Sequence, residues 1–438
     1  MTSITIQWGY DGKDRAMEAY SALANGDGGT ISILHDVDET GPEIVSSIRK
    51  EMRLPGTVSC YLLTSGMYSE TSSPIVKIEV PRAERSDRPV LAHGEAYIFD
   101  NGEVNRCSNP MRTCMERDAS DRPDDRDPVD ELTVDALDKG SIRRFRNIMR
   151  SVRPDHQWNI ESDEAFLRDI SATVPTPTGT RPTKAGLLMF GRENDITTVF
   201  PGFRLEHREL MGPDDSESYV ILSYDGEWTG NLFSFYSLVS ARIAFEFHHS
   251  DQHSPNEGSV RECVREGLVN ALCHSDYHGV GGIVSEYRKG SVRISNPGTL
   301  RTRPGTGADP RNPAIWRMFR LIGTAAGRGT GLERMYEAWD SMGLVKPSLE
   351  WGDSPCRVNL VLGTTRPLEL DPLDEIILGM MQNNGKCTVQ SIAEALKLSV
   401  SAVNVRIRHL KEKGAVERIG GTRGKWVIQN TYRNLRNS

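Results

Sequence analysis

The most regular alternation of apolar and polar positions lies near the C-terminus. Apolar residues recur at the helical period in VQSIAEALKL, which follows Thr388, and in VSAVNVRIRHLKEKG, which follows Ser399; both preceding residues are good helix N-caps. Another helical stretch comes before them, and two short alternating segments, 416–419 and 425–428, flank a glycine-rich turn. Three helices and a two-stranded hairpin predict a winged helix-turn-helix over residues 372–438.

The N-terminal residues show the pattern of a small α/β domain. Period-2 alternation predicts strands at 30–34, 74–80 and 95–99, and helical spacing predicts a helix over 13–24. We therefore expect a first domain over residues 1–115.

Two breaks in the pattern divide the rest of the chain. Residues 116–131 alternate charges around prolines, which is typical of a solvated linker, and two prolines bracket a short acidic stretch at 366–372. Residues 132–366 between them are long enough for one large domain or two smaller ones. The sequence thus predicts an α/β fold class, more broadly an α+β multidomain chain.

Composition agrees with several globular domains. The chain has 438 residues, 37% of them hydrophobic and 26% charged, and it exceeds the roughly 250–300 residues at which one core stops growing. No apolar run approaches the roughly 18 residues of a membrane helix, and the N-terminus lacks a signal-peptide pattern, so we expect a cytoplasmic protein with no membrane partner. The seven cysteines are scattered without a Cys-x-x-Cys pair, which favours reduced thiols over disulfides or structural zinc.

The charge is distributed unevenly. From Gly385 to the end there are eleven basic residues and three acidic ones, so this segment carries +8 although the whole chain carries −7. A basic terminal module on an acidic body is typical of a part that contacts nucleic-acid phosphates. Double-stranded DNA is the partner that this charge predicts.

The predicted winged helix carries the candidate DNA contacts. The second helix of such a motif presents its N-terminal face to the major groove, and the wing reaches the backbone or the minor groove. The candidates are Ser401, Asn404, Arg406 and Arg408 on the helix and Arg423 and Lys425 on the wing. The alternative is a winged helix that contacts protein, with its basic face merely solvated. The phrase KLSVSAVNVRIRHLKEKGAVERIG resembles bacterial winged-helix regulators.

A predicted helix in the central region carries candidate catalytic chemistry. In RECVREGLVNALCHSDY, residues 261–277, the polar residues Glu266, Asn270 and His274 follow at four-residue intervals. This spacing places them on one stripe of the helix. A carboxylate can activate water and an amide oxygen can ligate Mg²⁺ on nucleotide phosphates, which would make Glu266 a general base and Asn270 a magnesium ligand. The alternative is a solvated polar face.

Glycine-rich turns follow in the order expected for a phosphate site. Asn296 and Gly298 come directly after a predicted strand, and Gly327, Gly329 and Gly331 precede a helical pattern. Glycines at this spacing let backbone N–H groups approach phosphate at a helix N-terminus. Each turn alone is also typical of an ordinary connection. With the polar stripe, they predict a nucleotide site, with ATP and Mg²⁺ as the candidate ligands.

A zinc site is the rival interpretation of the histidines. His274 and His278 are four residues apart, a spacing that zinc uses on helices. A second group consists of His248, His249, Asp251 and His253. His278 follows the expected end of the helix, and the second group lies in a polar stretch that is typical of a loop, so the sequence favours no metal site.

The central motifs resemble the C-terminal domain of proteins labelled ATP-dependent DNA-helicase-like transcriptional regulators. The resemblance rests on AGLLMFG, VREGLVNALCHSDY, VRISNPGTL, RNP at 311–313 and GRGTGLERMYEAWDSMGL. The order of motifs also resembles the N, G1 and G2 boxes of the gyrase, histidine-kinase and mismatch-repair (GHKL) ATPases, which implies a GHKL-like α/β sandwich. Asn296 stands where those ATPases have an aspartate for adenine. No G-x-x-x-x-G-K-[ST] occurs, which argues against helicase motor activity.

Residues 1–115 resemble the Alba-like domain of bacterial Schlafen-type DNA-binding proteins. The resemblance rests on ALANGDGGTISILHDVDETG, IVKIEVP, RPV at 88–90 and AYIFDNG at 96–102. It implies a nucleic-acid-binding or interaction module. Schlafen-type nucleases hold a divalent metal with clustered carboxylates, whereas the corresponding IQWG at 6–9 has no acid, which disfavours nuclease activity.

Three hypotheses from different classes follow. The first is a DNA-binding transcriptional regulator that forms a homo-oligomer to read two half-sites and senses a nucleotide or other small ligand through its central domain. The second is a nucleotide hydrolase with Glu266 as general base. The third is a nucleic-acid-processing, Schlafen-like defence protein. The charge and pattern of the C-terminal module favour the first.

Overall fold

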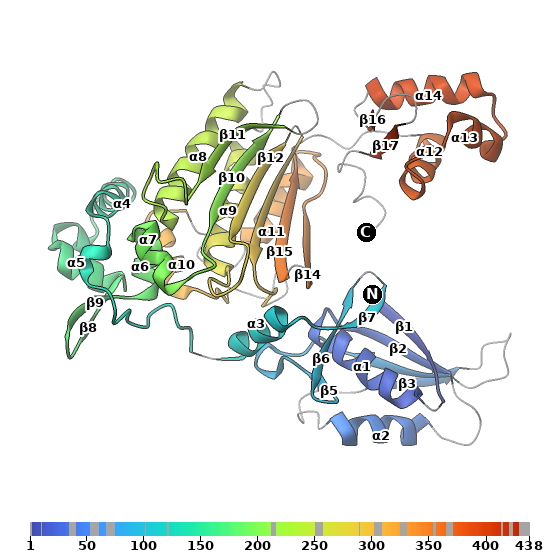
Figure 1. Ribbon diagram of the computed structural model, residues 1–438, viewed down its shortest axis with the longest axis horizontal. Helices are drawn as coiled ribbons and strands as arrows, with labels where there is room; N and C mark the ends of the chain where they lie inside the picture. Colours follow the sequence, from blue (N-terminus) through green and yellow to red (C-terminus); the bar gives the residue numbers. More distant parts are fainter. Residues whose placement is uncertain are drawn as a thin grey trace.

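The structure is a computed structural model, and Figure 1 shows its three parts: an N-terminal domain, a large central domain and a C-terminal module. It describes residues 2–9, 11–34, 41–52, 61–66, 75–100, 102–120, 122–211, 216–249, 257–288, 290–301, 309–324, 331–353, 356–364, 371–412, 415–419 and 424–428. The mixed α/β architecture expected from the sequence is confirmed.

The N-terminal domain is built on a four-stranded sheet with the strand order β1-β2-β4-β3, followed by a three-stranded sheet β5-β6-β7. Apolar residues of α1, among them Tyr20 and Leu23, pack against Ile31 and Ile33 of β2 because the two elements expose their apolar faces to each other. The elements are β1 (Thr2–Gln7), α1 (Gly12–Asn25), β2 (Gly29–Leu34), α2 (Gly41–Met52), β3 (Tyr61–Gly66), β4 (Ile75–Val80), β5 (Leu91–Ala92), β6 (Glu95–Asp100), β7 (Glu103–Arg106) and α3 (Asn109–Ala119). The predicted helix and the three predicted strands are confirmed by α1, β2, β4 and β6.

The central domain begins with a helical part that packs on the sheet domain that follows it. Its elements are α4 (Lys139–Val152), α5 (Asp163–Asp169), β8 (Thr173–Thr176), β9 (Gly179–Pro182), α6 (Lys184–Phe190) and α7 (Glu193–Val199). Phe145, Phe190 and Phe233 pack edge to face or tilted at the centre of this part. Phe233 belongs to α8 of the sheet domain, so the two parts share one hydrophobic core.

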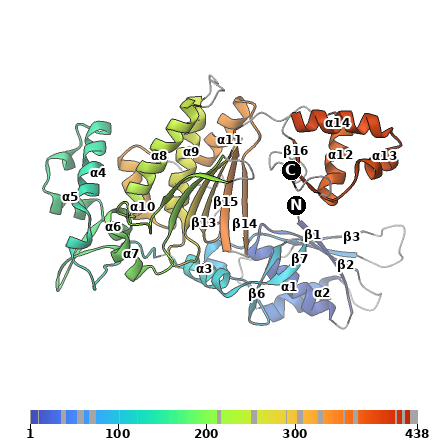
Figure 2. The same cartoon turned by 45° about the horizontal axis from the view of Figure 1, so that its top comes forward.

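The rest of the central domain is a six-stranded sheet with the order β11-β10-β12-β13-β15-β14, in which β10 and β12 are parallel and the other neighbours antiparallel. Helices α8, α9 and α11 lie on one face of this sheet (Figure 1 and Figure 2). The elements are β10 (Leu205–Leu210), β11 (Glu217–Leu222), α8 (Leu232–His249), α9 (Glu257–His274), β12 (Ile283–Arg288), β13 (Ser291–Pro297), α10 (Pro313–Leu321), α11 (Gly331–Ser341), β14 (Ser348–Asp353) and β15 (Cys356–Gly363). Helix α9 carries the predicted polar stripe, and it ends at His274, before His278.

The C-terminal module consists of three helices and a two-stranded wing, as the sequence predicts. Its elements are α12 (Pro372–Asn383), α13 (Val389–Leu396), α14 (Val400–Glu412), β16 (Val416–Ile419) and β17 (Lys425–Ile428). It has a hydrophobic cluster of its own, which includes Ile377, Ile392, Val403 and Trp426. Since this cluster is separate from that of the central domain, the module is built as an independent folding unit.

The prediction of a solvated linker at 116–131 is corrected by the structure. Helix α3 extends into this stretch, and Asp118 and Asp125 are buried. Main-chain N–H groups of Lys184 and Ala185 donate to the carbonyls of Asp127 and Asp125. The charged side chains whose alternation predicts exposure to solvent instead form hydrogen bonds with residues from distant parts of the chain.

Two further features concern expectations from the sequence. His248 and His249 lie in α8 and not in a loop, which corrects the interpretation of that stretch, while Asp251 and His253 lie outside the described residues. In the described part of the chain, none of the helices combines the length and the apolar character required to span a membrane.

Candidate nucleic-acid interface and interdomain pocket

The recognition helix of the C-terminal module is positioned by local signals in the sequence. Thr388 and Ser391 form a reciprocal capping box at the start of α13, and Lys397 takes a left-handed conformation at its end. The Ser399 hydroxyl then accepts from the N–H of Ala402 and begins α14. These caps fix the sharp turn between the two helices.

One face of α14 is buried and the other is exposed. Val403, Ile407 and Leu410 pack inward, which turns the candidates Ser401, Asn404 and Arg408 outward, where all three side chains are exposed. Two apolar residues share this exposed face: Ala402 and Val405, the latter 52% exposed. Neither was among the residues predicted to contact DNA, although their position outside the inward-facing period could have identified them. Small apolar side chains on a recognition helix can contact the methyl group of thymine.

Arg406 differs from the other candidates because it is held within the module. Its Nη1 donates to Asp374 at 2.8 Å and also to Asp371, the N-cap of α12. The hydrogen bond from Arg406 lowers the pKa of Asp371 below its usual value. Arg406 therefore joins α14 to the start of α12. The sequence predicts that this side chain contacts DNA, whereas in the structure it pairs with two aspartates of the same module.

The wing presents positive charge beside an aromatic ring. Lys425 is exposed at the start of β17, and Arg423 lies outside the described residues. Lys411 and Arg418 each lie within 5.3 Å of the Trp426 ring centroid, and the indole N–H donates to the Cys387 carbonyl. Trp426 thus fixes the wing to the helices, and its ring lies against two cations, Lys411 of α14 and Arg418 of β16.

The predicted nucleotide residues are divided between two places. Glu266 and Gly331 line a cavity of about 900 Å³ between α8, α9 and α11. A Cβ atom at Gly331 would overlap the Glu266 carboxylate in its present position, so the two residues lie in direct contact at the start of α11. Gly327 and Gly329, which precede it, lie outside the described residues.

The other predicted nucleotide residues lie toward the C-terminal end of α9. Asn270 is partly buried on the helix. The His274 carbonyl accepts from Arg311, and burial together with the charges of Arg311 and Arg301 lowers the pKa of His274 to about 4. His274 is therefore neutral at pH 7, which makes it a poor ligand for a phosphate anion.

The first glycine turn does not open onto a free surface in the structure. Asn296 is buried and its amide donates to the Pro297 carbonyl. Gly298 has a φ of +115°, and a Cβ there would lie 2.5 Å from Nη1 of Arg311. The structure thus brings Glu266 together with Gly331 and places Gly298 against Arg311, near the opposite end of α9. The nucleotide site stays a prediction.

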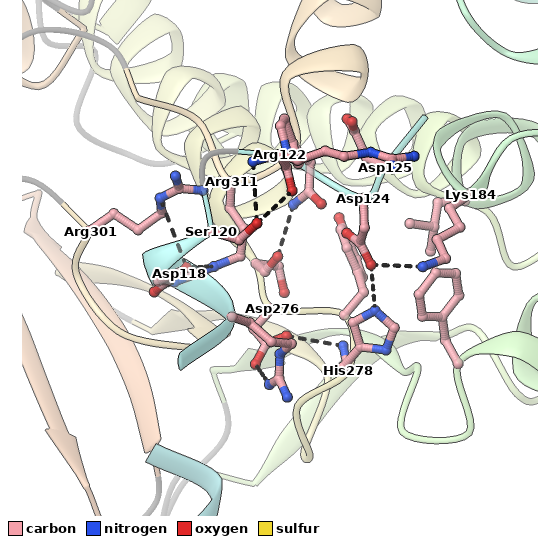
Figure 3. A pocket seen from close by; sticks show the side chains of 17 residues that line it. Asp118, Ser120, Arg122, Asp124, Asp125, Lys184, Asp276, His278, Arg301 and Arg311 are labelled. Atoms are coloured by element: carbon pink, nitrogen blue, oxygen red, sulfur yellow. Dashed lines mark hydrogen bonds and ion pairs between the residues drawn. The ribbon is translucent and has the colours of Figure 1, made fainter. Parts of the chain in front are cut away.

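A second pocket lies where α3, α6, the end of α9 and the segment before α10 meet (Figure 3). Its volume is about 240 Å³. On one wall, Asp124 accepts from His278 at 2.9 Å and from Lys184 at 2.8 Å. The hydrogen bond from His278, with further support from Lys184, holds the pKa of Asp124 well below its usual range. This wall joins Asp124 to Lys184, which is 60 positions further along the chain, and to His278, which is 154 positions further along.

The opposite wall of this interdomain pocket joins the N-terminal domain to the central domain. Asp118 of α3 is 4% exposed and accepts from Nε of Arg311 at 2.8 Å and from the Thr299 hydroxyl at 2.8 Å. Burial raises the pKa of Asp118, but the positive charges of Arg311 and Arg301 outweigh burial and hold it below its ordinary value. Asp118 is therefore a buried carboxylate with its countercharge in place.

In the part of the chain that the structure describes, the buried Asp125 forms no ion pair. Its Oδ2 accepts from the N–H of Ala314 at the start of α10 at 2.6 Å, whereas Oδ1 has no hydrogen-bond partner among the described residues. Burial raises the pKa of Asp125 from 3.8 to about 6. Among the described residues, no group of three or more His, Cys, Asp or Glu side chains is arranged to hold a metal ion. Asp125 is accordingly a buried acid at a helix start and not part of a recognisable metal centre.

This raised pKa predicts a pH dependence of stability. The folded chain binds the Asp125 proton more tightly than the unfolded chain, so the stabilisation is complete below about pH 4 and is lost as the pH rises through about 6. Asp125→Asn should remove up to about 3 kcal/mol of this loss. Urea unfolding of both proteins between pH 4 and 7 measures the effect, with the exposed Asp130→Asn as control. Parallel stability curves for Asp125→Asn and the wild type would contradict the expectation.

Comparisons with known proteins identify the C-terminal module. A family model described as winged helix-turn-helix DNA-binding matches residues 370–417. Another, described as a domain of unknown function (DUF8451), matches residues 113–206. Among solved structures the chain is similar to the DIP2311 protein from Corynebacterium diphtheriae, with 15% identity and a TM-score of 0.43 over 98% of this chain and 80% of that one. A comparison with curated proteins finds no match. The C-terminal module is therefore a winged helix-turn-helix DNA-binding domain, while the resemblances of the other two parts stay predictions.

Proposed function

We propose that this protein is a transcriptional regulator that reads double-stranded DNA with α14. The observation that carries the proposal is the exposed stripe of Ser401, Asn404 and Arg408 on the second helix of a winged helix-turn-helix. In such motifs this helix enters the major groove. The net charge of +8 from Gly385 onward supports binding to the phosphate backbone.

The side chains of the stripe suit different parts of a binding site. Arginine pairs with guanine and asparagine with adenine through two hydrogen bonds, so Arg408 and Asn404 suit base edges. Val405 suits a thymine methyl group, and Lys425 on the wing suits a phosphate. We propose that two copies of the chain bind two half-sites, since DNA-binding modules of this kind commonly work in symmetric pairs.

We propose that the cavity beside Glu266 binds a regulatory ligand in the central domain. Its volume of about 900 Å³ is in the range of small-molecule sites, and three arginines and two glutamates line it: Arg261, Arg265, Arg334, Glu262 and Glu266. The excess of one arginine favours an anionic ligand, for which a nucleotide is one candidate. In this proposal the ligand changes operator affinity.

The DNA-binding proposal is tested by selecting genomic fragments with the intact protein and measuring affinities for the bound fragments. Arg408→Ala should weaken binding by about tenfold or more, because a bidentate base contact contributes about 1–3 kcal/mol of discrimination. Arg143→Ala is the matched control, since Arg143 is an exposed arginine on α4 of the central domain. Equal affinities of the wild type and Arg408→Ala would show that α14 is not the reader.

A further inference from the structure

Two cysteines from different domains meet where helix α3 lies against the start of β15. Cys114 belongs to α3 of the N-terminal domain, and Cys356 is the first residue of β15 in the central domain. The Cys356 thiol donates a hydrogen bond to the sulfur of Cys114, and neither residue is part of a disulfide. Cys356 also packs against the hydrophobic cluster that includes Met111 and Met115 of α3. A disulfide requires side chains that already lie together, and these two sulfurs are in contact.

Contacts on both sides of Cys114 hold α3 against the central domain. At the start of the helix, Ser108 donates to the Asp353 carboxylate through its N–H at 2.7 Å and also through its hydroxyl. One turn after Cys114, Asp118 accepts from the Thr299 hydroxyl at 2.8 Å. The two segments are therefore fixed in place around the cysteines, and an S–S bond can form without a movement of the domains.

The surroundings of Cys114 favour its thiolate. Nη2 of Arg311 donates to the Cys114 sulfur at 3.7 Å. The hydrogen bond from Cys356 lowers the pKa of Cys114, and the charge of Arg311 acts in the same direction, whereas burial and the carboxylates of Asp118 and Asp276 oppose it. The same hydrogen bond, together with burial, raises the pKa of Cys356. Since the thiolate is the reactive form of cysteine, Cys114 is the nucleophile of the pair and Cys356 keeps its proton.

The other described cysteines lack these conditions. Burial raises the pKa of Cys107 to about 12 and that of Cys263 to about 11. It also raises the pKa of Cys273 and of Cys387. Protonated thiols that are buried in this way are inert. Among the described cysteines, Cys356 is the one that is partly exposed.

The burial of the pair limits which oxidant can reach it. Cys114 is 1% exposed and lies behind the partly exposed Cys356. This arrangement favours an oxidant little larger than water, such as hydrogen peroxide. In reducing compartments, disulfides are mostly transient and act in redox sensing, which agrees with a pair that is reduced at rest.

We propose that Cys114 and Cys356 form a redox modification site, in which a hydroperoxide converts the two thiols into a disulfide that joins the N-terminal domain to the central domain. The Cys114 thiolate attacks one peroxide oxygen, the O–O bond breaks with release of hydroxide, and Cys114 becomes a sulfenic acid. The Cys356 sulfur then attacks the Cys114 sulfur, the S–O bond breaks, and the Cys356 proton leaves with the oxygen as water. Two thiols and one hydrogen peroxide thus give one disulfide and two waters, and the peroxide takes up both electrons.

The disulfide is reversible and does not depend on the proposed DNA binding. A dithiol reductant restores both thiols by disulfide exchange. Because the bond closes a long loop of the chain, it reduces the entropy of the unfolded state. The oxidised protein should therefore unfold at a Tm about 2 °C or more above that of the reduced protein.

The intact protein tests this proposal. After treatment with hydrogen peroxide and proteolysis without reduction, mass spectrometry should find the Cys114 peptide linked to the Cys356 peptide, and dithiothreitol should separate them. Cys114→Ser and Cys356→Ser should each abolish the linked peptide and the rise in Tm. Cys263→Ser, at another buried thiol, is the matched control and should behave like the wild type.

A second readout identifies the nucleophile and serves if the buried Cys114→Ser variant does not fold. In Cys356→Ser, the sulfenic acid has no partner thiol, so dimedone added during unfolding should label Cys114 and leave Cys263 unlabelled. A reversible link between Cys114 and Cys356, together with this label, supports the proposal. The absence of the linked peptide, a disulfide between two copies of the chain, or equal oxidation of Cys263 and Cys114 overturns it.

Discussion

Replacing Asp118 with asparagine is expected to lower the free energy of unfolding by about 3–5 kcal/mol, the range found when one partner of a buried ion pair is removed. Asp118 is 4% exposed and pairs with Arg311, whose side chain is 11% exposed. Asparagine keeps the size of the side chain but removes the charge, so Arg311 and Arg301 would stay buried without their main counterion. The N-terminal domain should lose a buried ion pair with the central domain.

An ion pair with an exposed acid provides the control for this experiment. Asp163 is 74% exposed and pairs with Arg146, whose side chain is 12% exposed. Because solvent screens the exposed carboxylate, Asp163→Asn should lower stability by at most about 1 kcal/mol. Urea unfolding of the intact protein at pH 7 measures both variants. Similar stabilities for Asp118→Asn and Asp163→Asn would show that Asp118 contributes little to the domain contact.

The pH dependence provides an independent measurement of the same pair. The pKa of Asp118 is held below its unfolded value, so its contribution is present above about pH 4 and is lost as the pH falls through the folded pKa. Asp118→Asn should therefore lose less stability than the wild type on acidification. Asp125 has the opposite sign, since its raised pKa makes its contribution disappear as the pH rises.

The winged helix could be predicted in detail because its signals are local. The caps Thr388 and Ser399 and the inward period of Val403, Ile407 and Leu410 lie within a few residues of the elements that they define. The same period places Asn404 and Arg408 on the exposed face of α14. The exception is Arg406, because its partners Asp371 and Asp374 lie 35 and 32 positions away, at the start of another helix.

Residues 116–131 show why alternating charge alone does not predict exposure to solvent. Alternating acids and bases at 116–131 are typical of solvent exposure, yet Asp118 meets Arg311, which is 193 positions further along the chain. Asp125 reaches the start of α10 across 189 positions. Composition carries no information on such distant pairings, so the buried interface and the pocket beside it could not be predicted.

The polar stripe of α9 correctly predicts a helix, but its residues do not line one common site. Four-residue spacing puts Glu266 and His274 on one side of α9, but they are also about 12 Å apart along the axis at 1.5 Å per residue. Their surroundings differ accordingly: Glu266 lies against Gly331, and His274 lies beside Arg311. Spacing predicts which face a residue shares, whereas the neighbouring elements decide which pocket it lines.

Removing residues 371–438 is expected to lower the affinity for selected DNA fragments by at least about 1,000-fold, the difference that commonly separates specific from non-specific binding. The module has its own hydrophobic cluster, and the core of the central domain contains none of its residues. The shortened protein should therefore keep its fold, which circular dichroism and thermal unfolding can check. Affinity of the intact protein should also fall steeply with salt, by about 10³-fold between 50 and 200 mM if six phosphates are contacted.

The salt dependence separates two explanations for any binding that survives the truncation. If the acidic remainder still binds the same fragments with the same salt slope, the N-terminal or central domain is the reader, and the proposal for α14 is wrong. If the truncated protein loses both the affinity and the slope, the basic module supplies the phosphate contacts. Arg408→Ala in the intact chain then distinguishes base reading from phosphate binding, because loss of a base contact lowers affinity for selected fragments more than for unrelated DNA.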